Sequence, residues 1–337
     1  MRQMGSNRLA LLVLLVAMPL LLSINAAAQT ERPVTRTLKL SEWPGEIAAD
    51  GDRVAFVRGE TTAVIWTPAS RRVTRYPFDP GDGCEPGGMA LTRDFLAWNC
   101  EWESNSGTQI TIYVADRGRR RPTELIHDWY GPTLQGNLAG NDPFTVFNAG
   151  RHVAWRILSR GSPHSQRCPG GRLRCRRVAA GIQIADAAGG VIAGWVNGRL
   201  AVIDRSGRRR ALPVRKGGWA NFASVQLDRN AVYVARGNRL TAYALGSLKR
   251  IGRWSLAASE YGATLEDVQA GFAIYEVDEQ LRAIRLRDGR DVPIGPGGAA
   301  IDAAFGATGV FYAFTKGESD EAQIVFEPLT TFRRRFG

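Results

Sequence analysis

The sequence contains few of the residues on which catalytic and metal sites most often depend. Its 337 residues include four cysteines and three histidines, and His127, His152 and His164 are scattered without a metal-ligand spacing. A CxxC pair, a GxSxG elbow, an HExxH helix, a phosphate-binding GxxxxGK[S/T] loop and an EF-hand loop are all absent. The sequence therefore predicts no metal site and no cofactor, and no nucleophile is paired with a base by spacing.

Lysine is also scarce, because only four of the 44 basic residues are lysines and the others are arginines. With 32 acidic residues the formal net charge is +12. The chain is 44% hydrophobic and contains 38 glycines without a collagen period. This composition excludes a disordered or fibrous protein and is typical of an ordinary globular one.

The longest uncharged run lies at the N-terminus, where residues 9–22 follow Arg2 and Arg8 and precede Ala26-Ala27-Ala28. This pattern predicts a signal peptide over residues 1–28 and a secreted or periplasmic domain over residues 29–337. Fourteen apolar residues are fewer than the roughly 20 that span a bilayer, so no transmembrane segment is expected after cleavage. An uncleaved membrane anchor is the alternative. No cysteine lies near the cleavage site, which argues against a lipoprotein.

Four cysteines in an exported chain are expected to form disulfides. Cys84 lies close to Cys100 in the sequence, and Cys168 lies close to Cys175. Of the three possible connectivities we favour these two local pairs, and the crossed pairings are the alternatives.

After residue 38 the chain repeats one pattern of short strands separated by tight and basic turns, as in residues 50–76 and 228–251. The first apolar residue of the second strand recurs every 38 to 50 residues, at Val54, Leu96, Val146, Val191, Val232, Phe272 and Val310. Four-stranded units of this length are typical of a β-propeller, whose blades bury both faces by stacking. We expect an all-β fold with a single β-propeller of seven blades. Six blades are the alternative, because the third unit is irregular.

The last repeat needs a fourth strand, and two segments are candidates for it. Residues 34–40 alternate apolar and polar side chains and precede the first blade, so this N-terminal strand is expected to pair with the last blade and close the ring. Residues 330–336 are the competing candidate. Closure matters because an open ring would leave strand edges unpaired.

The repeats at residues 189–193 and 198–204 resemble those of secreted bacterial β-propellers of the broad TolB-like and WD-like type. The resemblance covers residues 34–336 in period and pattern. No Trp-Asp dipeptide is present, so the chain does not resemble a true WD-repeat protein. Similar propellers act as protein-binding platforms or as lyases, lactonases and hydrolases, so the resemblance implies the architecture and leaves the activity open.

One face of the propeller is expected to carry acidic loops with aromatic residues. The expected Cys84–Cys100 bridge would join two of these loops, and a third precedes the third blade. Aromatic faces with carboxylates bind sugars, cations and peptides, whereas soluble turns and residues between blades are the structural interpretation. The candidate ligand-binding residues are Asp82, Glu85, Glu101, Trp102, Glu103, Trp129 and Tyr130.

The opposite face is expected to be basic, because the turns between third and fourth strands are rich in arginine. Such turns attract phosphate or carboxylate polymers, although arginine also protects an outer strand from pairing. We expect a non-catalytic binding or structural propeller that engages an extracellular protein or an anionic envelope polymer, with no nucleic acid partner; an enzyme at the channel mouth, a lyase or hydrolase, is the alternative. The oligomeric state is not indicated. The basic face is represented by Arg119, Arg120, Arg121, Arg208, Arg209 and Arg210.

Overall fold

Short antiparallel strands joined by tight turns make up most of the structure, which is a computed structural model. It describes residues 34–337 except 81–82, 105–106, 117, 120, 131–145, 149–151, 160–161, 170–175, 181, 189, 218–222, 296–298 and 316–320. Only the backbone is described for residues 86, 103–104, 107–108, 110, 125–130, 146–148, 152–159, 162–169, 176–180 and 183. Residues Thr35–Gly337 belong to one unit.

The described strands form seven four-stranded sheets. Six of these sheets consist of four strands that are consecutive in the sequence, and the seventh combines three consecutive strands with β1 (Arg36–Leu40). The first four sheets in chain order are β2 (Ala48–Asp50), β3 (Arg53–Arg58), β4 (Thr62–Thr67) and β5 (Arg72–Pro77); β6 (Glu85–Leu91), β7 (Phe95–Ser104), β8 (Gly107–Asp116) and β9 (Thr123–Tyr130); β10 (Val146–Asn148), β11 (His152–Ser159), β12 (Ser162–Pro169) and β13 (Arg176–Ala180); and β14 (Ile182–Ala188), β15 (Val191–Val196), β16 (Arg199–Ile203) and β17 (Arg209–Arg215).

The remaining sheets follow the same order, and the last one takes its fourth strand from the N-terminal side of the chain. They are β18 (Ala223–Leu227), β19 (Ala231–Arg236), β20 (Arg239–Ala244) and β21 (Arg250–Ser255); β22 (Thr264–Gln269), β23 (Phe272–Val277), β24 (Gln280–Arg285) and β25 (Arg290–Pro293); and β26 (Ala300–Phe305), β27 (Gly309–Thr315), β28 (Ala322–Pro328) and β1 (Arg36–Leu40).

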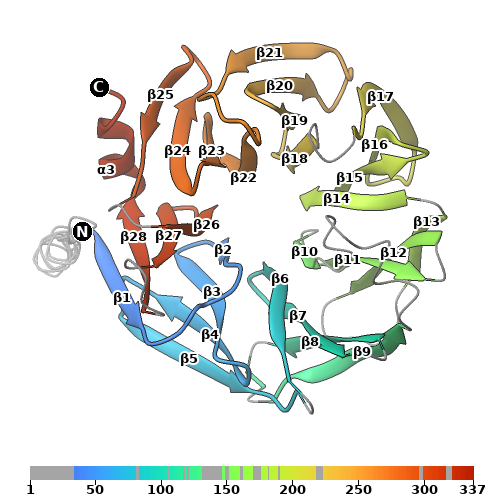
Figure 1. The fold of residues 1–337 in the computed structure, drawn as a ribbon, viewed down its shortest axis with the longest axis vertical. Coiled ribbons are helices and arrows are strands. Elements are labelled where there is room, and N and C mark those ends of the chain that lie inside the picture. The colour runs from blue at the N-terminus through green and yellow to red at the C-terminus, as the bar shows by residue number, and fades with distance from the viewer. Residues whose placement is uncertain are drawn as a thin grey trace, which may run out of the picture. The chain divides into compact units, whose positions relative to one another are not determined.

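The first strand of each sheet contacts the first strand of the next sheet, and the cycle returns from β26 to β2. Figure 1 shows the sheets arranged around a common axis, with β2, β6, β10, β14, β18, β22 and β26 innermost. This arrangement is a β-propeller, so the expectation of an all-β single propeller is confirmed.

Burial follows position within a sheet. The second strands β3, β15, β19 and β27 are buried along nearly their whole length, because both faces of a sheet pack on neighbouring sheets. The fourth strands β5 and β21 are mostly exposed, since each has an unpaired outer edge. Hydrophobic clusters accordingly lie between successive sheets, as in the cluster that contains Tyr76, Phe78, Trp98 and Tyr113.

The N-terminal strand β1 pairs antiparallel with β28, in a register that sets Arg36 opposite Phe326 and Leu40 opposite Ala322. The competing segment is not a strand, because Leu329–Arg334 forms the helix α3. The helix brings Phe332 and, just beyond it, Phe336 into the core as fully buried side chains. Phe332 and Phe336 are four residues apart, a spacing that places both side chains on one face of the helical segment.

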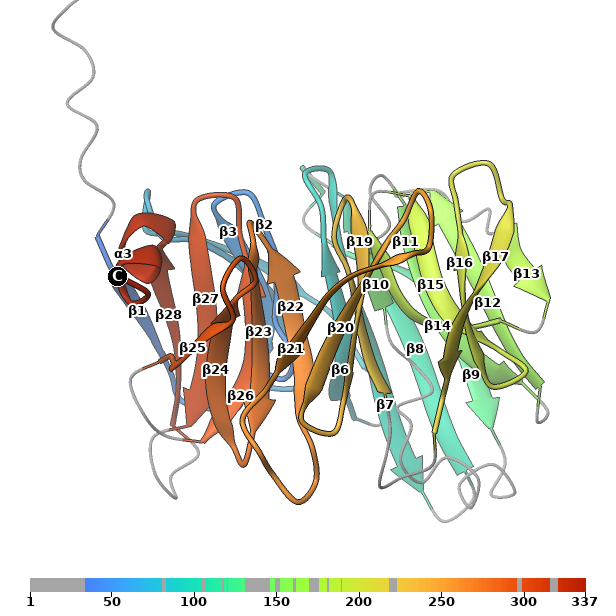
Figure 2. The ribbon, with the colours of Figure 1, turned by 90° about the horizontal axis from the view of Figure 1, so that it is seen from above.

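Figure 2 shows the sheets edge-on, with turns at two opposite edges. One edge contains the turns between first and second strands and between third and fourth strands; the other contains the connections between sheets and the turns between second and third strands. Among the described residues, which exclude 1–33, no helix is both long and apolar enough to cross a bilayer.

Candidate functional site

Three of the innermost strands carry an aspartate at a β-bulge. The pairing register shifts next to Asp186 in β14, Asp267 in β22 and Asp302 in β26. In each case the carboxylate Oδ1 accepts a hydrogen bond from the N–H of the following residue at 2.6 Å, and Oδ2 accepts one from the next sheet. The N–H donors in the next sheet belong to Leu227, Phe305 and Ile47, at 2.5, 2.7 and 2.7 Å from Asp186, Asp267 and Asp302 respectively.

A fourth junction, between the sheets of β18 and β22, uses neutral side chains for the same purpose. The N–H of Leu265 donates to Ser224 Oγ at 3.0 Å, and Gln226 Nε2 donates to the carbonyl oxygen of Glu266 at 2.8 Å. An amide or a hydroxyl can therefore replace the aspartate at this position. The common feature of the four junctions is a side chain from one innermost strand that holds the backbone of the next sheet.

Burial gives these aspartates unusual protonation behaviour. It raises the pKa of Asp186 to about 7 and that of Asp267 to about 6, although the two backbone donors to each carboxylate oppose the shift. Neighbouring carboxylates contribute further, since Asp267 acts on Asp186 and Asp302 acts on Asp267. Perturbed pKa values of this kind are common in catalytic sites, but structural networks produce them as well.

Glu266, beside Asp267 on β22, forms a carboxyl pair with Asp302 on the next sheet. Burial is the main cause that raises the pKa of both groups, and the two side chains form a hydrogen bond with each other, which raises the pKa of Glu266 further. Glu276 and Glu46 add like charge and raise the pKa of Glu266 further. We call Asp186, Glu266, Asp267 and Asp302 the axial carboxylates.

The axial carboxylates are not arranged as a metal centre. In the part of the chain that the structure describes, no three Asp, Glu, His or Cys side chains are grouped to hold a metal ion. Both oxygens of each aspartate accept hydrogen bonds from backbone N–H groups, so a structural role accounts for these carboxylates without a substrate or a cation.

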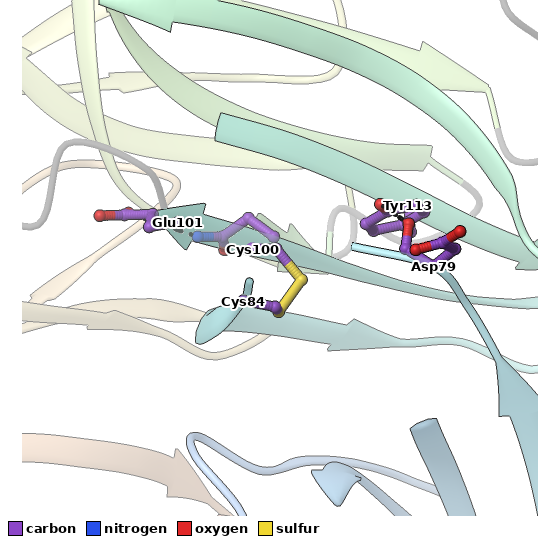
Figure 3. Close-up of a disulfide and its surroundings, with 6 residues drawn as sticks. Asp79, Cys84, Cys100, Glu101 and Tyr113 are labelled. Carbon is purple, nitrogen blue, oxygen red and sulfur yellow. Dashed lines mark hydrogen bonds between the residues drawn. A yellow bond between two sulfur atoms is a disulfide. The ribbon is translucent and has the colours of Figure 1, made fainter. Parts of the chain in front are cut away.

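The expected disulfide between Cys84 and Cys100 is confirmed. The two Cα atoms are 4.8 Å apart, and the bridge ties the start of β6 to β7 across a sequence separation of 16. In Figure 3, Glu101 points away from the bridge, and Tyr113 lies beside Asp79, whose carbonyl oxygen accepts a hydrogen bond from Tyr113 Oη at 2.9 Å. For the second expected pair, Cys168 lies in β12, and Cys175 lies outside the described residues.

Part of the expected acidic and aromatic cluster does meet at this bridge. Glu85, exposed at the start of β6, lies directly opposite Glu101 on β7. Trp102 packs over Gly83, because a Cβ atom on this glycine would lie 2.9 Å from the Trp102 ring. The two carboxylates and the indole therefore lie at one end of the sheet, with Trp102 half-buried. Asp82 lies outside the described residues.

The other aromatic candidates are placed differently from the expectation. Trp129 and Tyr130 end the strand β9 and are not in a linker. In the register, Gln109 of β8 lies opposite both Trp102 of β7 and Trp129 of β9, so the three residues form one row across the sheet. Glu103 is a strand residue as well, because the β7–β8 hairpin extends to Ser104. Alternating polar and apolar residues in 100–104 are the signal for this longer hairpin.

Arg119, Arg121 and Arg208 lie between third and fourth strands as expected, whereas Arg209 and Arg210 are the first two residues of the fourth strand β17 and not turn residues. All five lie on the edge opposite the disulfide end of β6 and β7. The side chains of Arg119, Arg121, Arg208 and Arg209 are exposed, and the first and third form ion pairs with acidic residues of their own turns. Arg210 is instead half-buried. It donates to the carbonyl oxygens of Gly246 and Leu245 in the next sheet, which is a structural role. Arg120 lies outside the described residues.

The axial carboxylates were missed by sequence reasoning. A signal is nevertheless present, because Asp186, Asp267 and Asp302 each interrupt an otherwise apolar or mixed first strand and are followed by Ala or Val. A lone aspartate within a strand that should be buried calls for a hydrogen-bond donor nearby. The donor cannot be read from the sequence, because it lies 38 to 255 residues away along the chain.

Comparison with known proteins shows the fold and leaves the activity open. No protein-family model matches the chain, and no curated protein matches its sequence. The structure is similar to a streptogramin B lyase, with a TM-score of 0.57, 10% identity, and coverage of 87% of this chain and 98% of that one. It is similar to virginiamycin B lyase from Staphylococcus aureus, with a TM-score of 0.55, 12% identity, and coverage of 87% of this chain and 100% of that one. It is also similar to the Swd1 β-propeller domain from Myceliophteria thermophila, with a TM-score of 0.59, 13% identity, and coverage of 86% of this chain and 99% of that one.

Proposed function

We propose that the chain is a non-catalytic extracytoplasmic binding protein, a propeller of seven blades closed by β1. Its basic face engages an anionic polymer of the cell envelope, or a protein that presents such a surface. The observation that carries the proposal is the division of charged residues between two places. The aspartates near the axis accept hydrogen bonds from backbone N–H groups of the next sheet, whereas Arg119, Arg121, Arg208 and Arg209, at and beside the turns between third and fourth strands, are exposed.

An anionic polymer fits the exposed arginines by charge and by hydrogen bonding. Guanidinium groups form strong, charge-assisted hydrogen bonds with phosphate and carboxylate, and Arg119 and Arg208 each expose 69% of their side chains. The ion pairs that these two residues form are exposed and local, so they stabilise the turns little and can be exchanged for a ligand.

The test measures binding of the mature protein to long-chain inorganic polyphosphate at increasing salt. Affinity should fall steeply with salt because bound counterions are released, and exchange of Arg119, Arg120, Arg208 and Arg209 for glutamate should abolish it. Absence of binding at low salt, or unchanged binding by this variant, would leave protection of the strand edges as the role of these arginines.

The second candidate is an enzyme that acts at the axial end of the propeller, as a lyase or hydrolase. The observation in its favour is Glu266, whose raised pKa and position on an innermost strand would suit a general acid. Its burial and its hydrogen bond with Asp302 account for the raised pKa without a substrate. Exchange of Glu266 for glutamine should leave polyphosphate binding unchanged under our proposal. A turnover activity that this variant lacks would favour the enzyme.

Export is a separate part of the proposal and has its own measurement. The mature N-terminus of the protein recovered from its source should be Gln29, if signal peptidase cleaves after Ala28. The Cys84–Cys100 bridge is compatible with an oxidising compartment. Recovery of the unprocessed chain from a reducing cytosol would contradict the proposed location.

A further inference from the structure

The first residue of the fourth strand is almost always the same residue type. Six of the seven fourth strands in the structure begin with arginine, and β9 alone begins with another residue, Thr123. The fourth strand is the outermost of its sheet. These arginines therefore mark the outer margin of the basic face in six of the seven sheets. We call them the basic rim, which comprises Arg36, Arg72, Arg176, Arg209, Arg250 and Arg290.

Three members of the basic rim are available to a ligand. Arg72, Arg209 and Arg250 are exposed, and within the described residues none of them has an ion-pair or hydrogen-bond partner for its guanidinium group. They belong to three different sheets, those of β5, β17 and β21. Arg290 is different, because its Nη1 atom donates to the carbonyl oxygen of Phe336 at 2.5 Å.

Position on the outermost strands separates these guanidinium groups from one another. Stacked sheets pack about 10 Å apart, and sheets that diverge from a common axis are farther apart at their outer strands. A single phosphate or sugar acid is too small to reach two such positions. A flexible chain with many negative charges can contact several of them at once, and each additional contact increases the overall affinity.

We propose that the basic rim binds a polyanion along its length, so that one polymer chain contacts arginines from several sheets. The inference rests on the proposed function and adds the binding mode, in which one polymer chain spans several sheets along the rim. Arginine at the start of an outer strand also discourages pairing of that edge with another chain, and the two roles are compatible.

The experiment compares orthophosphate, tripolyphosphate and polyphosphates of increasing chain length. Affinity per phosphate group should rise with length until the chain spans several sheets, and the salt dependence should become steeper over the same range. Poly-L-glutamate forms a second arm, which distinguishes phosphate from carboxylate as the preferred group.

A variant and a matched control test the location. Combined Arg72→Glu, Arg209→Glu and Arg250→Glu exchanges should weaken long-chain binding by about 100-fold or more at low salt. The control combines Arg58→Glu, Arg199→Glu and Arg239→Glu, which are exposed residues of the same three sheets beside the turns at the opposite edge. The control changes the net charge equally and should retain most of the binding. A combined Arg→Gln variant at the rim serves if the glutamate variant aggregates.

The outcomes separate the two proposals. If no polyanion binds at low salt, both the proposed function and the rim inference are wrong. If long chains bind but affinity per phosphate does not depend on length, or the control loses as much binding as the rim variant, the rim inference alone is overturned. Length-dependent binding that only the rim variant loses supports it.

Discussion

Charged residues occupy both the axis and the rim of this propeller, and they do opposite things in the two places. Near the axis, Asp186, Asp267 and Asp302 are half-buried and bound to backbone N–H groups of two sheets. On the rim, Arg72 and Arg209 are exposed at the starts of outer strands. The difference shows that a charge can serve the fold where it is enclosed and remain available for a ligand where it is not.

The contrast is clearest in how much stability the folded protein should lose when each kind of residue is replaced. Loss of one of the axial aspartates leaves two backbone N–H groups without their acceptors. Loss of a rim guanidinium leaves only a more exposed turn. Stability and binding should therefore separate between axis and rim, and each of the following measurements can contradict that separation.

The largest effect on stability is expected from the disulfide, which lies at the end of the innermost strand β6. Exchange of both Cys84 and Cys100 for alanine should lower the free energy of unfolding by about 3 kcal/mol, because a closed loop of this length restricts the unfolded chain. Denaturant titration of the non-reduced protein measures this difference. Polyphosphate binding should persist in the folded variant, and its loss would place the binding site near the bridge instead of on the rim.

Exchange of Asp302 for alanine should have a comparable but smaller effect. It removes the acceptor of the Ile47 and Ala303 N–H groups and the partner of Glu266, so we expect a loss of about 2 kcal/mol in the free energy of unfolding. The control is Glu60→Ala, an exposed carboxylate in a turn, which should change stability by less than about 0.5 kcal/mol. Equal effects of the two exchanges would show that the axial hydrogen bonds do not hold the sheets together.

The pH dependence of stability should distinguish the axis from the rim in the same protein. The folded-state pKa of Asp186 is about 7, above the value of about 3.9 in an unfolded chain. A raised carboxyl pKa favours the folded state at low pH, and this contribution is lost as the pH rises through 7. The melting temperature should therefore rise from pH 8 to pH 5 in the natural protein relative to an Asp186→Asn variant. Parallel pH profiles of the two proteins would contradict the raised pKa.

The propeller and the Cys84–Cys100 disulfide could be predicted from the sequence, because short segments of the chain contain the patterns that indicate them. The period of the second strands and the spacing of Cys84 and Cys100 are local patterns. The hydrogen bonds between sheets could not be predicted, since Asp302 and Ile47 are 255 residues apart in the sequence and a β-bulge leaves no clear pattern of apolar and polar residues. The segment 330–336 shows the same limit. Its apolar residues fit either a strand or a helix, and the buried Phe332 and Phe336 decide for the helix only when their neighbours are known.

That helix also changes an expectation about the two chain ends. The sequence alone predicts that removal of residues 34–40 lowers the melting temperature far more than removal of residues 333–337. The second truncation, however, removes Phe336 from the core and takes Arg335 away from the buried Glu327, whose Oε1 atom accepts its hydrogen bond at 2.9 Å. Glu327 would keep the hydrogen bond from Tyr312 Oη but lose its counter-charge, which is costly for a buried carboxylate, so both truncations should lower the melting temperature substantially. Differential scanning calorimetry of the two variants checks this, and a small effect of removing residues 333–337 would show that the helix is dispensable.

The smallest effect on stability should come from the rim itself, where the effect on binding is largest. The combined exchange of Arg72, Arg209 and Arg250 for glutamate breaks no ion pair among the described residues, and all three side chains are exposed, so the free energy of unfolding should change by less than about 1 kcal/mol in total. Denaturant titration beside polyphosphate binding on the same preparation measures both quantities. A large loss of stability together with the loss of binding would mean that rim and axis serve the fold alike. Unchanged stability together with lost binding would show that these arginines contact the ligand. A charge reversal that leaves the fold unaffected can remove binding only through the interaction with the ligand itself.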